Sequence, residues 1–190
     1  MKNLDDKPKI IYALGNIDNL NKKCVAIIGS RECTSYGKKI TQLISYFYAK
    51  KGYVIVSGLA KGIDTSAHIG ALLAGGRTIA VFGTPLNKIY PYENTELARK
   101  IISANGTIIS EYSLNDKIKR DNFAYRNRII SGLCSDIIVV EAKEKSGALI
   151  TAEYALQQGK NVYAVPGNVN NPNSFGTNKL IKDGAKILIF

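Results

Sequence analysis

Residues 25–31 read Val-Ala-Ile-Ile-Gly-Ser-Arg, a short apolar run that ends in glycine and a cation. Similar runs rich in valine and isoleucine recur along the chain, and longer segments of helical periodicity separate them. The runs are continuously apolar rather than alternating, which is typical of strands that helices cover on both sheet faces. We therefore predict an α/β fold with an open, doubly wound, mostly parallel sheet of Rossmann type.

The expected elements alternate along most of the chain. The predicted strands cover residues 25–29, 53–57, 78–82, 107–111, 136–141, 161–165 and 186–189. The predicted helices cover residues 36–51, 64–74, 94–104, 124–134, 148–158 and 176–183, with Asp64 as an N-cap candidate. We interpret residues 1–23 as an N-terminal lead-in segment. Residues 24–190 are then a single Rossmann-like domain, with no second domain behind it.

Length and composition are those of a globular protein. The chain has 190 residues, of which 45% belong to the hydrophobic set and 22% are charged. The long apolar run that a membrane span needs is missing, and charges stand where a signal peptide would have its apolar region. These features predict a cytoplasmic protein without a membrane partner. Three cysteines without CxxC spacing and one histidine favour reduced thiols and no metal site.

The charge balance points to a polyanion. Lysine and arginine number 26 against 15 acidic residues, giving a net charge of +11 and a pI near 9.5. Such an excess is typical of proteins that bind nucleic acid. A genome biased toward lysine, asparagine and isoleucine would give the same sum, because net charge does not show whether the cations cluster.

The predicted ligand site lies where the strands end. In an open α/β sheet, ligands bind outside the carboxyl ends of the strands, and glycines there let backbone amides approach a phosphate. The residues that follow the predicted strands include Gly29, Ser30, Arg31, Gly58, Lys61, Ser146 and Gly147. Each glycine taken alone is also ordinary turn chemistry. Neither GxGxxG nor a P-loop is present, which argues against an NAD dehydrogenase or a P-loop ATPase.

Residues 116–128 form a basic strip that contains aromatic residues. Five basic and two acidic residues occur here, with Phe123 and Tyr125 among them. Cations neutralise phosphates while rings stack on unpaired bases, so this composition predicts binding of single-stranded nucleic acid. Helical spacing places Arg126 at the ligand edge, whereas Arg128 either contacts phosphate or pairs with a carboxylate such as Glu141. Phe123 is either a stacking ring or a core anchor.

Asp64 and His68 lie four residues apart on one predicted helix face, which suggests a hydrogen-bonded pair. The alternative is helix capping together with packing against the neighbouring loop. The remaining carboxylates near the edge are scattered and give no acid–base pair. We therefore predict no catalytic residue and no cofactor.

The ordered motifs resemble those of the DNA processing protein A family (DprA/Smf), from about residue 8 to the end. The matching strings are Val-Ala-Ile-Ile-Gly-Ser-Arg at 25–31, Ser-Gly-Leu-Ala-Lys-Gly-Ile-Asp at 57–64, Ala-His at 67–68, Ile-Ala-Val-Phe-Gly-Thr at 79–84, Ile-Tyr-Pro at 89–91, Glu-Asn at 93–94, Arg-Asn-Arg-Ile-Ile-Ser-Gly at 126–132, Val-Val-Glu-Ala at 139–142, Ser-Gly-Ala-Leu-Ile-Thr-Ala at 146–152, Ala-Val-Pro-Gly at 164–167 and Gly-Thr-Asn-Lys-Leu-Ile-Lys-Asp-Gly-Ala at 176–185.

This resemblance implies a cytosolic bacterial protein that binds and protects incoming single-stranded DNA and helps to load the RecA recombinase during natural transformation, without a chemical step. Together with the residues of the edge and the strip, the expected DNA-binding set is Gly29, Ser30, Arg31, Gly58, Lys61, Lys119, Arg120, Phe123, Arg126, Asn127, Arg128, Ser146 and Gly147. The resemblance also implies a homodimer, with Leu180 and Ile181 near the contact.

The chain departs from the family pattern in several places. Pro85 stands where the family usually has glycine, and Ala124 where proline is common before the Arg-Asn-Arg string. We expect neither the helical N-terminal domain nor the winged-helix domain of many members. The alternative function is an enzyme resembling the lysine-decarboxylase-like nucleotide phosphoribohydrolases, with Arg126 and Glu153 acting on a nucleotide. Residues 146–151 lack the glycine-rich part of the turn that those enzymes use.

Overall fold

Eight strands form one sheet within residues 6–189, the part of the chain that the computed structural model describes. The strands are β1 (Tyr12–Gly15), β2 (Cys24–Ile28), β3 (Val54–Ser57), β4 (Thr78–Phe82), β5 (Thr107–Ser110), β6 (Asp136–Val139), β7 (Asn161–Ala164) and β8 (Lys186–Ile187). Their order across the sheet is β1-β5-β4-β3-β2-β6-β7-β8. Strands β2 to β8 pair in parallel, and β1 pairs antiparallel with β5. The predicted mostly parallel α/β sheet is confirmed.

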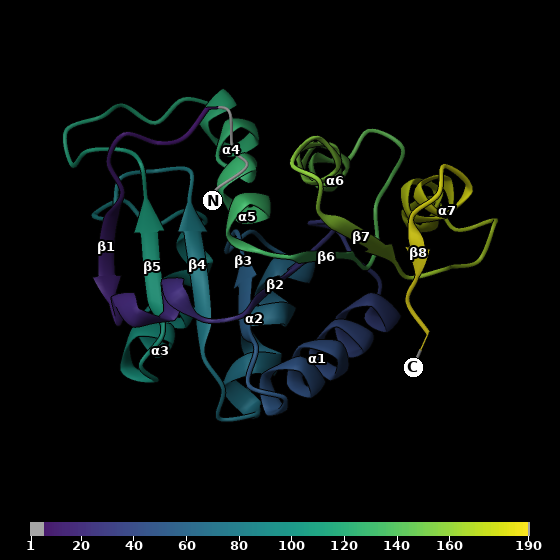
Figure 1. The fold of residues 1–190 in the computed structure, drawn as a ribbon, viewed down its shortest axis with the longest axis horizontal. Helices are drawn as coiled ribbons and strands as arrows, with labels where there is room; N and C mark the ends of the chain where they lie inside the picture. The colour runs from purple at the N-terminus through teal and green to yellow at the C-terminus, as the bar shows by residue number, and fades with distance from the viewer. Residues whose placement is uncertain (1–5, 190) are drawn as a thin grey trace.

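Helices cover both faces of this sheet, as predicted (Figure 1). The α-helices are α1 (Ser35–Lys50), α2 (Ile63–Leu73), α3 (Thr95–Ser103), α4 (Asp121–Tyr125), α5 (Asn127–Leu133), α6 (Gly147–Gln157) and α7 (Phe175–Lys182). Short 3-10 helices lie at η1 (Ile17–Asn21), η2 (Tyr92–Asn94) and η3 (Pro172–Ser174). Helices α1, α2 and α3 pack on one face, and α5, α6 and α7 pack on the other.

Strand β2 shows how the sequence builds two cores. Val25 and Ile27 are fully buried against α1 and α2, whereas Ala26 and Ile28 face α5 and α6. Side chains of a strand alternate between faces, so a strand covered on both sides must be apolar throughout. Each fully buried valine or isoleucine contributes roughly 1.5–3 kcal/mol.

Two elements differ from the prediction. Strand β1 lies in the segment that was interpreted as a lead-in, and its residues are half-buried or exposed, so it lacks the apolar signal of the other strands. The predicted helix at 124–134 is divided at Arg126 into α4 and α5. The amide of Ile129 donates to the carbonyl of Arg126, a tight three-residue bond at this division.

The strand order reverses its direction between β2 and β6. From β2, the chain adds β3, β4 and β5 on one side and then crosses over to add β6, β7 and β8 on the other. Loops on either side of such a switch point separate from each other and leave a crevice at the carboxyl edge. The switch point therefore separates two groups of loops at the carboxyl edge, those over β3 and β4 and those over β6 and β7.

Candidate nucleic-acid interface

Arg126 is buried beneath the loops that follow β3 and β4. Its side chain donates from Nη1 to the carbonyl oxygen of Gly58 at 2.9 Å and to that of Val81. The residue is 4% exposed, so its guanidinium does not stand on the rim as the sequence predicted. A Cβ atom at position 58 would lie 2.6 Å from Arg126 Nη2, which explains the need for glycine there. Arg126 thus positions the loops of the site.

Asp64 is the carboxylate whose charge acts most strongly on this buried cation. Burial raises its pKa, and the charge of Arg126 and the amides of Ala60 and Gly58 oppose that rise. Burial likewise lowers the pKa of Arg126 to about 10, and Asp64 opposes that change. The Asp64 carboxylate accepts from the Gly58 amide at 3.1 Å and from the Ala60 amide at 3.3 Å. Arg126 and Asp64 therefore bind the same loop, one through a carbonyl and the other through amides.

The predicted pair between Asp64 and His68 is wrong. His68 Nδ1 instead lies 2.7 Å from Thr78 Oγ1, which itself donates to the carbonyl of Ile55. Helix α2 begins at Ile63 with Gly62 as its N-cap, so Asp64 lies in the first turn and does not cap it. The alternative, packing against the neighbouring loop, describes Asp64 correctly. Burial and the charge of Arg126 lower the pKa of His68 to about 3.

Asn127 extends the Arg126 network toward α6. Arg126 Nε donates to Asn127 Oδ1 at 3.2 Å, and Asn127 Nδ2 donates to the carbonyl of Gly147 at 3.2 Å. Ser146 caps α6 by accepting from the Ala148 amide at 3.3 Å. Gly147 is exposed, and apart from its chain neighbours and the backbone of α6 no atom of the described residues lies within 4 Å of where its Cβ would be. The network joins four predicted site residues and leaves the start of α6 open to solvent.

Arg128 forms a structural pair, but with a different carboxylate from the one expected. Its Nη2 donates to Glu111 Oε2 at 2.6 Å rather than to Glu141. The guanidinium also stacks on the ring of Tyr125 at 3.8 Å, and Asp6 lies 3.6 Å from its Nε. Arg128 is 3% exposed and makes its contacts inside the protein.

Phe123 lies over the residue that follows β4. A Cβ atom at Gly83 would lie 2.8 Å from Phe123 Cδ1, so the ring packs directly on the glycine backbone. The ring centre is 5.1 Å from that of Tyr90, with the planes tilted by 46°. Phe123 is only half-buried and Tyr90 is exposed. The ring is therefore anchored at one side and accessible at the other.

Four predicted cations are exposed: Arg31 and Lys61 in the loops after β2 and β3, and Lys119 and Arg120 just before Phe123 in the chain. Lys61 pairs with Glu93 at 2.5 Å, and this hydrogen bond raises the pKa of Lys61. Within residues 6–189, the other three cations make no ion pair. Their charge is therefore available to a ligand, whereas Lys61 would first have to leave Glu93.

Gly29 and Ser30 are packed between loops. A Cβ at position 29 would lie 2.7 Å from the carbonyl oxygen of Glu141, and the Ser30 amide donates to that same oxygen at 2.7 Å. The carbonyl of Ser30 accepts from the Ile63 amide at 3.1 Å. These two residues thus tie β2 to β6 and α2, and hold Arg31 at the surface.

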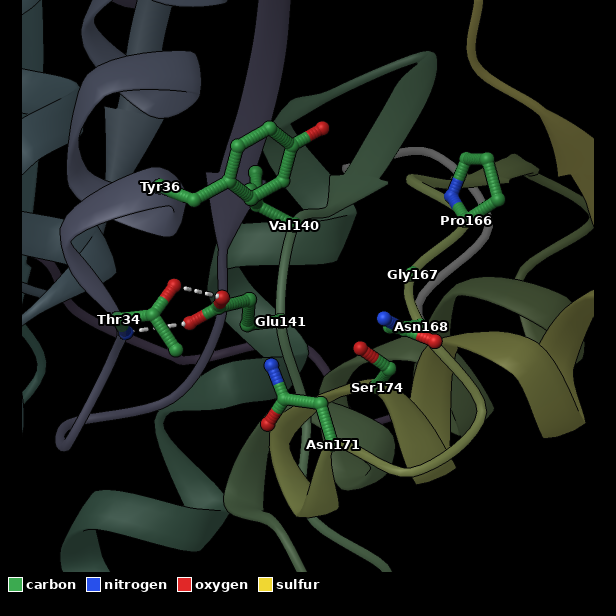
Figure 2. Close-up of a pocket in the computed structure, with 9 residues that line it drawn as sticks. All are labelled: Thr34, Tyr36, Val140, Glu141, Pro166, Gly167, Asn168, Asn171 and Ser174. Carbon is green, nitrogen blue, oxygen red and sulfur yellow. Dashed lines mark hydrogen bonds between the residues drawn. The ribbon is translucent and has the colours of Figure 1, made fainter.

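Glu141 was expected at the edge only as a possible partner of Arg128, and its contact with Thr34 was not predicted. Its buried carboxylate accepts from the Thr34 amide at 2.8 Å and from Thr34 Oγ1 at 2.5 Å, at the N-terminus of α1. It lines a pocket of about 610 Å³ between the ends of β6 and β7 and the start of α1 (Figure 2). A glutamate after a strand carries no signal of burial, because only the fold brings it against Thr34.

The enzyme alternative receives no support from these contacts. Arg126 is buried whereas Glu153 is exposed on α6, and no hydrogen bond or ion pair of the described residues joins them. In the described part of the chain, no cluster of three or more His, Cys, Asp or Glu side chains is placed to hold a metal ion. Among residues 6–189, no helix is both long and apolar enough to cross a membrane.

These features define an α/β protein of Rossmann type whose carboxyl edge presents unpaired cations beside an accessible ring, a class suited to a polyanionic ligand. The chain belongs to the DNA recombination-mediator protein A family, whose profile matches residues 1–189. It is 43% identical to DNA processing protein DprA of Bacillus subtilis over 189 residues, which are 99% of this chain and 63% of the relative.

Solved structures agree with this assignment. The X-ray structure of DNA processing protein A from Streptococcus pneumoniae matches with a TM-score of 0.92 and 42% identity, over 98% of this chain and 65% of the other. DNA processing protein A from Helicobacter pylori matches with a TM-score of 0.91 and 36% identity, over 99% and 86%. The latter structure concerns a single-stranded DNA binding mode. The chain spans just under two thirds of the Bacillus and Streptococcus relatives.

A molybdenum cofactor carrier protein from Chlamydomonas reinhardtii matches with a TM-score of 0.58 but only 16% identity, over 88% of this chain and 90% of the other. At this level of identity the likeness concerns the fold alone.

Proposed function

We propose that this chain binds single-stranded DNA across the loops that follow β2, β3, β4 and β5, without carrying out a chemical step. The observation that carries the proposal is the Phe123 ring, which is fixed on Gly83 and Tyr90 yet accessible, beside cations that make no ion pair. Phosphates are neutralised by cations while a ring stacks on a base, which only an unpaired strand offers freely.

The residues of the site divide into two roles. Arg31, Lys119 and Arg120 are exposed and would contact phosphates, with Lys61 joining them after it separates from Glu93. Arg126, Asn127 and Arg128 are buried and hold the loops from beneath. Gly29, Ser30, Gly58, Ser146 and Gly147 shape the backbone around them.

Fluorescence anisotropy with a labelled oligothymidine and a duplex of the same length tests this proposal. We expect preferential binding of the single strand, and a loss of about five- to hundredfold in affinity for Phe123→Ala, because a stacked base contributes about 1–3 kcal/mol. Phe123→Leu is the matched variant that keeps apolar contact with Gly83 but lacks the ring face. Equal affinity for the duplex, or unchanged binding by Phe123→Ala, would contradict the proposal.

Salt dependence identifies the phosphate contacts. Removal of one cation that neutralises a phosphate lowers the slope of log affinity against log salt by about 0.7 for a single strand. We expect this change for Arg31→Ala and for Arg120→Ala. Lys100→Ala is the matched control, because Lys100 is exposed in the last turn of α3, at the opposite edge of the sheet. If the slope changes equally in the control, the salt dependence of the affinity reflects the net charge of the protein rather than contacts at this site.

The wider role rests on the family and is part of the same proposal. The protein would act in the cytoplasm, protect incoming DNA during natural transformation and help to load RecA. It would do so as a homodimer with Leu180 and Ile181 at the contact, both of which are half-buried on α7. Sedimentation of the wild type and Ile181→Asp tests the dimer, which the substitution is expected to dissociate. RecA filament formation on coated single strands tests the loading.

A further inference from the structure

The pocket between β6 and β7 has no role in the proposed DNA edge. Thr34 and Tyr36 line it from the start of α1, and Val140 and Glu141 from the end of β6. The loop after β7 contributes Pro166, Gly167, Asn168, Asn171 and Ser174. Its volume of about 610 Å³ lies within the range of small-molecule sites. It also lies beside the switch point of the sheet, where open α/β folds bind their ligands.

The position that would hold a phosphate in such a fold is already filled. Anions bind at helix N-termini because the first amides of a helix lack partners. At the N-terminus of α1, the Glu141 carboxylate accepts a hydrogen bond from the Thr34 amide at 2.8 Å. Thr34 Oγ1 accepts one from the Gly37 amide at 2.9 Å. A Cβ at Gly37 would lie 2.5 Å from the carboxylate, so no space remains for a second anion. The pocket therefore disfavours a free nucleotide phosphate.

The rest of the lining suits an uncharged flat ring. Tyr36 is 57% exposed, and Figure 2 shows its ring and the ring of Pro166 on opposite sides of the pocket. Asn168, Ser174 and Asn171 line the pocket below these two rings in the view of Figure 2 and supply donors and acceptors. Among the residues that the structure describes, no lysine or arginine lines the pocket. An aromatic face with amide groups at its edge is how proteins hold an unstacked base.

We propose that this pocket is a nucleobase site, in which Tyr36 stacks on the base, the asparagines contact its edge, and Glu141 excludes a phosphate. This inference rests on the proposed function, because the base would come from the bound strand. Asn173 Nδ2 donates to the carbonyl of Glu32 at 3.0 Å and so joins the wall of the pocket to the loop that carries Arg31. Arg31 is three residues from Thr34, which places it within about 10 Å along the chain.

Titration with free deoxynucleosides and their 5′-monophosphates, followed by NMR shifts of the Gly167 and Asn168 amides, tests the pocket without DNA. We expect saturable binding of the nucleoside and no gain in affinity from the phosphate. Tyr36→Ala should weaken binding about tenfold and Tyr36→Phe should retain it, because the ring face is the contact. No nucleoside binding, or tighter binding of the monophosphate by the wild type, would overturn the inference.

Glu141→Gln tests the exclusion of phosphate. The neutral side chain removes the resident charge, and we expect the monophosphate to gain at least fivefold in affinity relative to the nucleoside. An unchanged ratio in a folded Glu141→Gln protein would overturn the role of Glu141. Where this variant does not fold, the affinities of the wild type for the nucleoside and for the monophosphate decide the same point. If Glu141 excludes the phosphate, the monophosphate must bind no more tightly than the nucleoside.

Oligothymidine binding separates this inference from the proposed function. Tyr36→Ala should lower the affinity for the strand about tenfold, whereas Tyr46→Ala, an exposed ring elsewhere on α1, should not. Strand binding that is unaffected by Tyr36→Ala overturns the base site while the DNA edge stands. Absence of strand binding in the wild type overturns the proposed function, and nucleoside binding then shows a site for free nucleosides only.

Discussion

Each half of the carboxyl edge has a buried side chain that binds backbone groups of the loops, a guanidinium in one half, where Asp64 is buried as well, and a carboxylate in the other. Over β3 and β4, the guanidinium of Arg126 is held by carbonyl oxygens of Gly58 and Val81. Over β6 and β7, the carboxylate of Glu141 is held by the amide and hydroxyl of Thr34. A nucleotide-binding fold leaves such backbone groups for its ligand. Here the chain satisfies them itself, so the ligand must be recognised by exposed side chains.

Among these substitutions, removal of the buried Arg126 cation should have the largest effect on stability. Arg126→Ala leaves the Gly58 and Val81 carbonyls without their donor and Asp64 without the opposing charge, so we expect a loss of roughly 3–5 kcal/mol in unfolding free energy. Urea unfolding followed by circular dichroism measures it. Arg99→Ala is the control, because Arg99 is exposed and pairs only with Glu96 at 3.5 Å, so it should change little. Equal midpoints for the two variants would contradict the structural role of Arg126.

A pH titration probes the surroundings of that cation. The pKa of His68 is lowered from 6.5 to about 3, chiefly by burial and then by the charge of Arg126. As pH falls below 6.5, His68 binds a proton in the unfolded chain, whereas in the folded chain it stays neutral down to about pH 3. Stability therefore falls in this window. Between pH 7 and pH 5 the loss should be about 2 kcal/mol.

His68→Gln isolates this contribution. Unfolding free energies of the variant measured at pH 7, 6 and 5 should decline less steeply than those of the wild type, whatever its absolute stability. Burial raises the pKa of Asp64, which adds stability as pH falls, but that contribution is present in both proteins. Parallel curves for the two proteins would show that the imidazole does not titrate as the structure requires.

The smallest expected effect on stability concerns the half of the edge over β6 and β7, where Glu141 is buried. Gly37→Ala would place a methyl group 2.5 Å from the anchored Glu141 carboxylate, and the crowding should outweigh the gain in helix propensity by about 1 kcal/mol. Gly147→Ala is the matched control at the start of α6, where the new methyl group would meet no described atom beyond its chain neighbours and the helix backbone. Thermal unfolding should rank Gly37→Ala below the wild type and Gly147→Ala at or above it. The reverse order would mean that the carboxylate moves freely.

The fold was predictable because burial on both faces leaves a direct mark on composition. The runs at β2, β3 and β4 are apolar throughout, so each central strand could be placed within one or two residues. Strand β1 escaped prediction because its four residues are half-buried or exposed and carry no such mark. What makes it a strand is the backbone of β5 beside it, which local sequence does not encode.

The site was predictable in location but not in the roles of its residues. Glycines after strands located the edge, and the strip at 116–128 located the exposed Lys119 and Arg120. Arg126 and Arg128 belong to the same basic strip and cannot be told apart from those cations in the sequence, yet both are buried. Whether an arginine points outward or inward depends on which carbonyls and carboxylates the fold brings beneath it. The contact between Glu141 and Thr34, 107 residues apart, is of the same kind.

Strand β1 also protects the sheet from other copies of the chain. Its residues pair with β5 from Tyr12↔Ser110 to Gly15↔Thr107, and all four residues of β5 are buried. A chain that began at residue 24 would leave the backbone edge of β5 unpaired, and such an edge is a template for strand pairing between molecules. By pairing with β5, the four residues of β1 therefore cover an edge at which chains could otherwise associate.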